Sequence, residues 1–398
     1  MDSFRDESCC PVVSLSFHLE NSIMIGLKHY KTLLASAFLA MLSVSVSAQN
    51  KTIAIGYQAP LSGENAQYGT LFRNSATLAV DEFNKSGRLP GVTVQLKFED
   101  SKSDAKEGVN IARKFSDDQS IVAVIGDFNS TVSMAAGQVY AQTKVAQLSQ
   151  TASHPDYVKI SEYQFRNINT QAYEGPLIAN WAFSQGVKKV AVVAIQNDWG
   201  QSAAKNFVEG FKAQGGTALD VEYFNPGTRD FRAILTKIGR SQPDAIFIGA
   251  FYEDGSAFLQ QKVQMGLKQP VYSTSSLYEQ KLIDLAGPAA NGLHLTTTFL
   301  STSTEPHIAA FVKAYEARYA SKPQQFAAQA FDATNIMLNA IVAAGGANAT
   351  RAKVRDALAA TKDFPGVTGK TSFDPVTREP IKLLTKLQIR DGKYVSVK

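Results

Sequence analysis

Strand-like and helix-like segments alternate along most of this chain, from Thr52 to about Ser321. Short apolar runs such as residues 121–125 are typical of buried strands, whereas residues 68–84 carry apolar positions at helical spacing. Strands separated by helical segments of this kind form βαβ units with right-handed crossovers and a parallel sheet. The alternation therefore predicts an α/β fold.

The alternation runs through two similar stretches, which meet near residues 165–169. Together they hold more strands than one sheet of usual width, so we expect two Rossmann-like α/β lobes. The C-terminal third adds predicted helices at 306–319, 328–344 and 351–361 and a strand pair at 383–389 and 394–397. Asp391 and Gly392 form a turn signal between these last strands.

The N-terminal segment has the features of a secretory signal. Basic residues at 28–31 precede an apolar run at 33–46 and a small-residue site, so we expect cleavage after Ala48. Serines interrupt the run, which is too short to favour the alternative of a membrane anchor. Residues 1–23 lie upstream and are interpreted as an extension from an early start codon. Both cysteines fall in this extension.

Removal of the signal leaves about 350 residues without cysteine, enough to bury a core across two domains. This part has no second apolar stretch of membrane length. The whole chain carries a net charge of +5, but its basic residues are scattered and form no stripe of the kind that nucleic acids need. We therefore expect a soluble periplasmic protein that does not bind nucleic acid.

Two loops with similar chemistry follow predicted strands, at residues 125–131 (IGDFNST) and 148–155 (LSQTASHP). Each offers small hydroxyl residues and backbone N–H groups where a helix would begin, and such groups suit an anion. In an open parallel sheet, ligands bind beyond the carboxyl ends of the strands. The loops therefore predict a site for a carboxylate-like group.

Catalytic signatures are missing from the sequence. There is no Gly-x-Ser-x-Gly elbow and no His-Glu-x-x-His pair, and the three histidines after residue 48 are far apart in the chain. Residues 366–371 resemble a phosphate-binding loop, but the glycine spacing is wrong and no buried strand precedes them. We therefore expect neither an enzyme nor a metal or cofactor site.

Six segments taken together carry a family resemblance. In chain order they are residues 60–69, 125–131, 148–155, 198–200, 227–231 and 249–253. They resemble the type I periplasmic solute-binding proteins of the leucine/isoleucine/valine-binding group, which serve ABC importers. The resemblance extends from about Lys51 to the C-terminus.

The resemblance implies two lobes that close on a ligand about a three-stranded hinge, with crossings near 166–170, 294–299 and 373–378. Lobe one would comprise residues 51–168 and 297–374, and lobe two residues 169–296 and 375–398, after an extension and signal at 1–48. Only contacts made in the closed form can drive closure, so both lobes must touch the ligand.

On lobe one, the resemblance implies that Ser130 holds the ligand carboxylate through its hydroxyl and N–H. Thr151 would contribute a backbone contact, Ser153 a second hydroxyl, and Tyr68 an aromatic wall. Helix capping is the alternative role for the two serines, and core packing for the tyrosine.

On lobe two, the resemblance places Tyr173, Trp199 and Phe251 near the cleft, with core packing as the alternative. Ser275 stands where amino-acid binders of the family carry a glutamate that pairs with the ligand ammonium. Because a buried ammonium without a carboxylate partner is costly, this replacement leaves the ammonium subsite open. Asp198, Glu253 or Asp254 could substitute for the missing glutamate. Phe251 and Phe331 stand at positions where tyrosines are common in the family.

The expected function is delivery of a small carboxylate-bearing solute to the membrane subunits of an ABC permease by a monomeric receptor. A branched-chain or other amino acid is the family default. Aromatic or aliphatic carboxylates, amides and urea remain as an alternative. A second class of function is a ligand sensor of the same fold.

Overall fold

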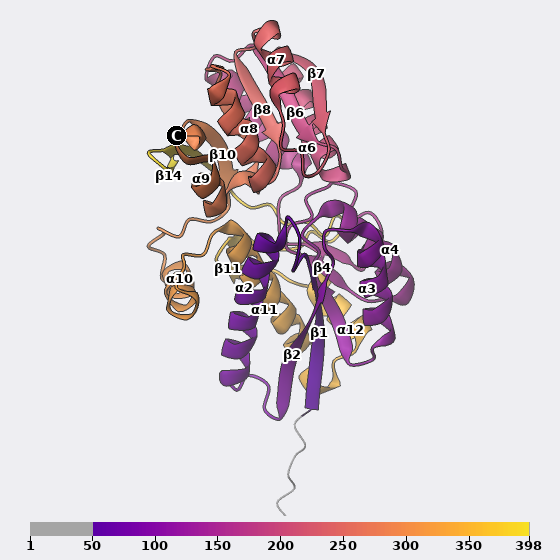
Figure 1. The fold of residues 1–398 in the computed structure, drawn as a ribbon. Helices are drawn as coiled ribbons and strands as arrows, with labels where there is room; N and C mark the ends of the chain where they lie inside the picture. The colour runs from indigo at the N-terminus through magenta and orange to yellow at the C-terminus, as the bar shows by residue number, and fades with distance from the viewer. Residues whose placement is uncertain (1–50, 398) are drawn as a thin grey trace, which may run out of the picture. The chain divides into compact units, whose positions relative to one another are not determined.

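The computed structural model of the protein describes residues 51–397. The predicted signal, its cleavage site at Ala48 and the upstream extension lie outside these residues. All described elements belong to one compact unit. Within this unit the strands form two main sheets that belong to separate lobes (Figure 1).

The first sheet has five parallel strands in the order β2-β1-β3-β4-β5. Its strands are β1 (Lys51–Ala59), β2 (Val92–Asp100), β3 (Ile121–Ile125), β4 (Gln147–Ser149) and β5 (Gln164–Arg166). Its helices are α2 (Ala66–Lys85), α3 (Ala105–Asp117), α4 (Ser130–Thr143), α10 (Pro306–Tyr319), α11 (Gln325–Ala343) and α12 (Arg351–Ala359). Helices α2 and α11 pack together on one side of the sheet, and α3 and α4 on the other (Figure 1).

The second sheet has seven strands in the order β14-β13-β10-β9-β8-β6-β7. Its strands are β6 (Lys189–Ile195), β7 (Thr217–Phe224), β8 (Ala245–Gly249), β9 (Val271–Ser273), β10 (Leu293–Thr297), β13 (Thr385–Arg390) and β14 (Lys393–Ser396). Its α-helices are α5 (Gln171–Ser184), α6 (Asp198–Ala213), α7 (Arg232–Ser241), α8 (Tyr252–Gln264) and α9 (Gln280–Ala286). The pairs β10–β13 and β13–β14 are antiparallel, and the other pairs are parallel. The predicted α/β fold with two lobes is confirmed.

The chain passes three times between the two sheets, as predicted. The first connection runs from β5 to α5, the second from β10 to α10, and the third from the hairpin β11 (Phe364–Gly366) and β12 (Gly369–Thr371) to β13. Asn169 links two of them, because its amide donates to the carbonyl of Lys382 at 2.7 Å and accepts from its N–H at 2.8 Å. The precise residue limits proposed for the two lobes stay predictions.

Several local structures differ from expectation. Residues 366–371, which resemble a phosphate loop in sequence, belong to the β11–β12 hairpin, for which no strands were predicted. Most of the second predicted crossing is strand β10. Strand β9 and helix α9 were not predicted, because three and seven residues are too short to show a clear periodicity.

The predicted final hairpin is present, and both turn residues, Asp391 and Gly392, have positive φ (49° and 70°). Helices near the site begin with side-chain caps: Asn129 caps α4 and Asn197 caps α6 by accepting from backbone N–H groups. These caps fix where each helix starts at the carboxyl edge of its sheet.

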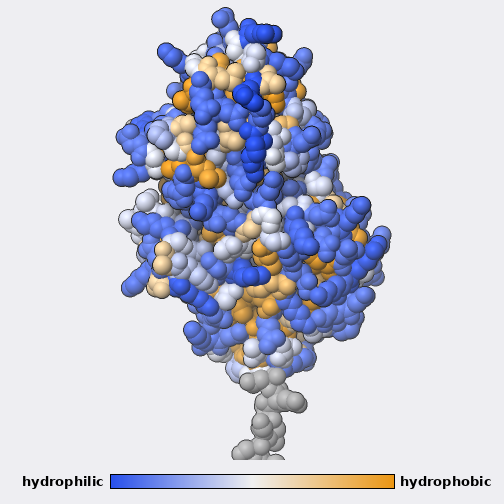
Figure 2. Space-filling model, viewed as in Figure 1, coloured by the Kyte–Doolittle hydropathy of each residue, from blue (hydrophilic) through white to orange (hydrophobic). Residues whose placement is uncertain are grey.

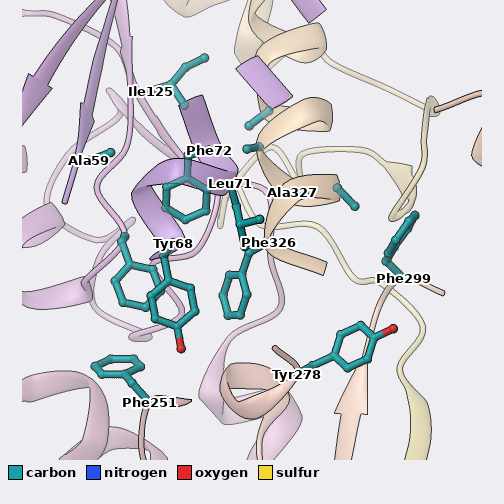
Figure 3. Packing of buried hydrophobic residues seen from close by; sticks show 14 of the residues in the cluster. Ala59, Tyr68, Leu71, Phe72, Ile125, Phe251, Tyr278, Phe299, Phe326 and Ala327 are labelled. Atoms are coloured by element: carbon teal, nitrogen blue, oxygen red, sulfur yellow. The ribbon is translucent and has the colours of Figure 1, made fainter. Parts of the chain in front are cut away.

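An aromatic cluster links the cores of the two lobes. Tyr68 on α2 is fully buried, and its ring lies between Phe251 of lobe two and Phe326 of α11 (Figure 3). Tyr68 also stacks on Phe128 with 4.1 Å between ring centroids. The face of the molecule in Figure 2 is mostly hydrophilic, with hydrophobic residues in small separate patches. No helix within residues 51–397 is long and apolar enough to cross a membrane.

Candidate ligand-binding site

The two loops singled out in the sequence meet at one edge of the first sheet. Their preceding strands, β3 and β4, pair in parallel with Ile125 beside Leu148. The Thr151 hydroxyl of the second loop donates to the carbonyl of Phe128 in the first at 2.9 Å. The backbone N–H of His154 donates to the Ser130 hydroxyl at 3.3 Å. The loops therefore form one cross-linked surface.

Ser130 is the first residue of α4 and is almost fully buried. The cap residue Asn129 accepts from Thr131 N–H at 2.9 Å. Within the described part of the chain, the Ser130 N–H has no acceptor. Its hydroxyl accepts from His154 and keeps its own proton for another acceptor. Ser130 thus offers two donors at a helix N-terminus, an arrangement that suits a carboxylate.

Ser153 is held by two residues of the other lobe. Its hydroxyl oxygen accepts from Nε2 of Gln171 at 2.9 Å and from Nε1 of Trp199 at 3.0 Å. Both partners are donors, so the hydroxyl proton of Ser153 points elsewhere and can be donated to a ligand. The Trp199 bond joins side chains of the two lobes, and the structure is therefore in a closed form.

A small cavity lies between the loops and lobe two. Its volume of about 20 Å³ leaves room for about one water molecule. A larger ligand can therefore enter only after the lobes separate or the lining rings turn. Six predicted residues line the cavity: Ser130, Thr151, Ser153, Trp199, Phe251 and Ser275. Seven further lining residues were not predicted: Phe128, Asn129, Ile168, Gln171, Thr274, Ser276 and Phe326.

Two predicted residues do not line this cavity. Tyr68 lies one layer behind the lining, where its hydroxyl donates to the carbonyl of Ser276 at 3.3 Å and accepts from Tyr252 N–H at 3.2 Å. Tyr173 is half-buried on α5 and lies outside the lining. Phe331 packs on Phe311 with 4.5 Å between ring centroids, also away from the lining.

The three carboxylates suggested as substitutes for the missing glutamate also lie off the cavity. Glu253 and Asp254 both contact Arg229, with 3.2 Å between Asp254 Oδ1 and the guanidinium. Burial raises the pKa of Asp254 to about 7 despite this partner. Asp198 borders a separate depression next to His154. Within the described residues, none of the three lines the cavity or bonds to Ser275.

A different carboxylate, Glu174, stands directly behind Ser275. Its Oε1 accepts from the Ser275 N–H at 2.8 Å and from the Thr296 hydroxyl. Desolvation by burial raises the pKa of Glu174, and the bonds from Thr296 and Ser275 oppose this shift. Glu174 was not predicted from the sequence, although it is an acidic residue in the first turn of a predicted helix after a crossing.

Comparison with known proteins decides the family. Residues 52–393 match the family described as periplasmic binding protein. This chain belongs to the periplasmic binding protein family. The resemblance to the leucine/isoleucine/valine-binding group is thereby confirmed, and the family consists of solute-binding proteins rather than enzymes.

Relatives of this periplasmic binding protein span nearly its whole described length. Leu/Ile/Val-binding protein homolog 1 of Brucella melitensis is 27% identical over 347 residues, which cover 86% of this chain and 92% of that protein. A Rhodospirillum rubrum structure, provisionally assigned as a branched-chain amino acid ABC transporter, is 45% identical, with a TM-score of 0.67 over 87% of this chain and all of that one. LivJ of Streptococcus pneumoniae in complex with isoleucine is 29% identical, with a TM-score of 0.80 over 87% of this chain and 100% of that chain.

Further contacts hold the lobes of this binding protein together beside the cavity. The Tyr252 hydroxyl on α8 donates to the carbonyl of Glu64 at 3.2 Å. Arg229 of lobe two forms an ion pair with the same residue, with 3.5 Å between Nη2 and the Glu64 Oε1. The site is thus enclosed by contacts that involve both lobes.

Proposed function

We propose that this protein is an extracytoplasmic receptor that binds one small carboxylate-bearing solute and delivers it to the membrane subunits of an ABC importer. The observation that carries the proposal is the hydroxyl of Ser153. It receives two bonds from lobe two and retains a proton for the ligand, so ligand binding and lobe closure involve the same atom. Ser130 supplies matching donors at the start of α4.

Apolar α-amino acids are the first ligands to test. The Brucella relative is named as a Leu/Ile/Val-binding homologue, and the LivJ structure contains isoleucine. Aromatic rings of Phe128, Trp199, Phe251 and Phe326 line the cavity and fit an apolar side chain. The receptor is exported by the predicted signal, which ends at Ala48. It acts as a monomer and catalyses no reaction.

Carboxylates or amides without an ammonium group form a second candidate class. The observation in their favour is that no charged residue lines the cavity. A sensor of the same fold would bind the same solutes, but it would signal to another protein instead of supplying a permease.

A thermal-shift screen of the chain from residue 49 tests the proposal. Its two arms are apolar amino acids and organic acids without nitrogen. A ligand at a hundredfold excess over its Kd should stabilise the protein by about 2.7 kcal/mol. No shift with any compound of either arm would contradict the proposal. A loss of uptake in cells that lack the protein, restored by the wild-type gene, distinguishes a transport receptor from a sensor.

A further inference from the structure

We propose that closure of the two lobes is coupled to the uptake of one proton by Asp254, so that the closed form is favoured as the pH falls from about 8 to about 6. The proposal rests on the function proposed above in one respect, namely that ligand binding closes the lobes. It concerns a charged cluster beside the ligand cavity, which comprises Glu64 of lobe one and Arg229, Glu253 and Asp254 of lobe two. We call it the Arg229 cluster.

Glu64 is the only member of the cluster that belongs to lobe one, and three segments of lobe two contact it. Its carbonyl accepts from the Tyr252 hydroxyl at 3.2 Å, and its Oε1 lies 3.5 Å from Nη2 of Arg229. A Cβ atom added at Gly227 would lie 2.7 Å from the same Oε1, so the backbone there packs directly against the Glu64 side chain. Separation of the lobes would break all three contacts.

Arg229 is shared by three carboxylates. Its Nη1 lies 3.2 Å from Oδ1 of Asp254, and its Nη2 contacts both Glu253 and Glu64. Lys102 of lobe one borders the same depression of about 260 Å³, but it forms no ion pair with the cluster within residues 51–397. The cluster therefore has an excess of negative charge, and closure increases this excess by adding Glu64.

Asp254 is the most deeply buried member of the cluster. Its side chain is 7% exposed, whereas that of Arg229 is 49% exposed. Desolvation by burial raises the pKa of Asp254 to about 7. The positive charge of Arg229 opposes this increase, and the negative charges of Glu64 and Glu253 add to it. The Asp254 carboxyl therefore gains or loses its proton near neutral pH.

Two tyrosine hydroxyls also face Asp254, but they stay neutral in this pH range. Tyr68 of α2 and Tyr252 of α8 are both near the carboxyl, and burial raises the pKa of each phenol above its ordinary value of 10. The charge of the Arg229 cluster near neutral pH is therefore set by its three carboxylates and one guanidinium.

Opening of the lobes changes the surroundings of Asp254 in two ways. It moves Glu64 away and lets water into the depression, and both changes lower the pKa of Asp254. Arg229 and Glu253 remain beside it, because they belong to the same lobe. Since the pKa is higher in the closed form, closure binds a proton, and a fall in pH favours closure.

The size of the effect follows from this difference in pKa. With a pKa of about 7 in the closed form and an ordinary carboxyl pKa in the open form, closure becomes about tenfold more favourable between pH 8 and pH 6. A smaller difference gives a smaller factor, and we expect about three- to tenfold.

The first test measures affinity at pH 6 and pH 8 by calorimetric titration. Leucine and benzoate are the probes, and neither changes its charge between these pH values. The Kd of a probe that binds should be about three- to tenfold lower at pH 6 than at pH 8 for the wild-type protein. Asp254→Asn has nearly the size of the protonated side chain and carries no charge, so its Kd should depend less on pH by about the same factor.

The second test needs no ligand. The chain has only two tryptophans, so Trp199, which is buried between the lobes, is the single indole in Trp181→Phe. Acrylamide quenching of Trp199 increases when the lobes separate. Quenching in the ligand-free protein should be weaker at pH 6 than at pH 8, and the addition of Asp254→Asn should remove this difference.

Asp230→Asn is the matched control. It makes the same chemical change in an exposed carboxylate that pairs with Arg232 within lobe two, and it should keep the wild-type pH dependence. A circular-dichroism melt of each variant establishes that it is folded. If Asp254→Asn does not fold, Glu64→Gln decides, because this half-exposed side chain can be changed without disturbing the core. Glu64→Gln should reduce the pH dependence, and a dependence equal to that of the wild type would then overturn the proposal.

The outcomes separate this proposal from the receptor function. Probe binding with the same pH dependence in the wild-type protein and in Asp254→Asn would overturn the coupling and leave the receptor function standing. Failure of both probes to bind at either pH would count against the receptor function, and the quenching measurements would then decide the coupling. Equal pH differences in quenching with and without Asp254→Asn would overturn it.

Discussion

The hydroxyl of Ser153 in lobe one accepts a hydrogen bond of 3.0 Å from the indole nitrogen of Trp199 in lobe two. The ring of Trp199 also stacks on Phe251, with 4.9 Å between centroids, so its position is fixed by packing as well as by the bond. This pair joins the anion-binding loop to the aromatic wall across the cleft. The presence of this bond therefore indicates that the two lobes are closed.

Trp199→Phe keeps an aromatic ring and removes the donor. Loss of one neutral hydrogen bond in the closed form should raise Kd by about three- to tenfold, which corresponds to about 0.5–1.5 kcal/mol. Calorimetric titration measures the change. Trp181→Phe is the control, because Trp181 packs on Tyr272 in the core of lobe two and should leave Kd unchanged. Equal affinities of Trp199→Phe and wild type would show that the bond does not stabilise the closed form.

Ser130→Ala removes a hydroxyl from the proposed carboxylate subsite. The expected loss in binding free energy is about 1.5–3 kcal/mol for any ligand with a carboxylate, because the bond is made to a charged acceptor. Ser184→Ala removes a hydroxyl that bonds only to the Trp181 carbonyl in its own helix and should have no effect on affinity. Titration of the same ligand into both variants makes the comparison. An unchanged affinity in Ser130→Ala would rule out this anion assignment.

Glu279 gives a pH-dependent prediction. Desolvation raises the pKa of this buried carboxyl from its ordinary value of 4.5 to about 7, so the folded state binds more protons than the unfolded state between these values. The contribution of Glu279 to the free energy of unfolding is fully present below pH 4.5 and is lost as the pH rises through about 7. Glu279→Gln has no carboxyl to ionise. Relative to wild type, its free energy of unfolding should therefore increase by about 1–3 kcal/mol between pH 4.5 and pH 8.

Urea unfolding at both pH values measures the difference in the free energy of unfolding between the two proteins. Because other titrating groups are common to both proteins, their contributions cancel in this difference. A difference that does not change with pH would contradict the raised pKa of Glu279.

Asp332 on α11 supports the third connection. Its carboxylate accepts from the N–H groups of Val367 and Thr368 at 2.8 Å each, and Lys382 Nζ lies 4.0 Å away. Burial lowers the pKa of Lys382 to about 8, while the Asp332 charge opposes the shift. Asp332→Asn removes the negative charge and should lower the free energy of unfolding by about 2–4 kcal/mol.

The control for Asp332 is Asp374→Asn. Asp374 accepts from two backbone N–H groups in the same pattern, but it is fully exposed. The decrease in the free energy of unfolding, measured by urea unfolding, should therefore be much smaller for Asp374→Asn than for Asp332→Asn. Comparable losses in the two variants would mean that burial of the Asp332–Lys382 pair does not determine the effect.

Local patterns were sufficient to predict the architecture. The helix at 306–319 was predicted to the residue, and the Asp391–Gly392 turn joins the two predicted strands. The loops that contain Ser130 and Ser153 could be chosen because each follows an apolar strand and offers small hydroxyl residues, whereas the two serines themselves were assigned from the family resemblance. These local structures depend on residues that are close together in the chain, and can therefore be predicted from sequence patterns.

The remainder of the site depends on contacts between distant segments. Glu174 finds its hydrogen-bond partners in Ser275 and Thr296, which are more than 100 residues away along the chain. Phe128 was read only as part of a loop, yet it stacks on Tyr68 and forms much of the aromatic wall. Such contacts between distant segments depend on how the two lobes pack together, and the periodicity of apolar residues does not predict this packing.

The reciprocal bonds between Asn169 and Lys382 have a consequence for how the receptor moves. They join the first and third connections, so we expect these two segments to move together when the lobes open. The segment after β10 is then left to absorb its own backbone rotation. We expect the lobes to open by rotation about one axis, and we expect a substitution that removes these bonds to allow one lobe to shift sideways against the other.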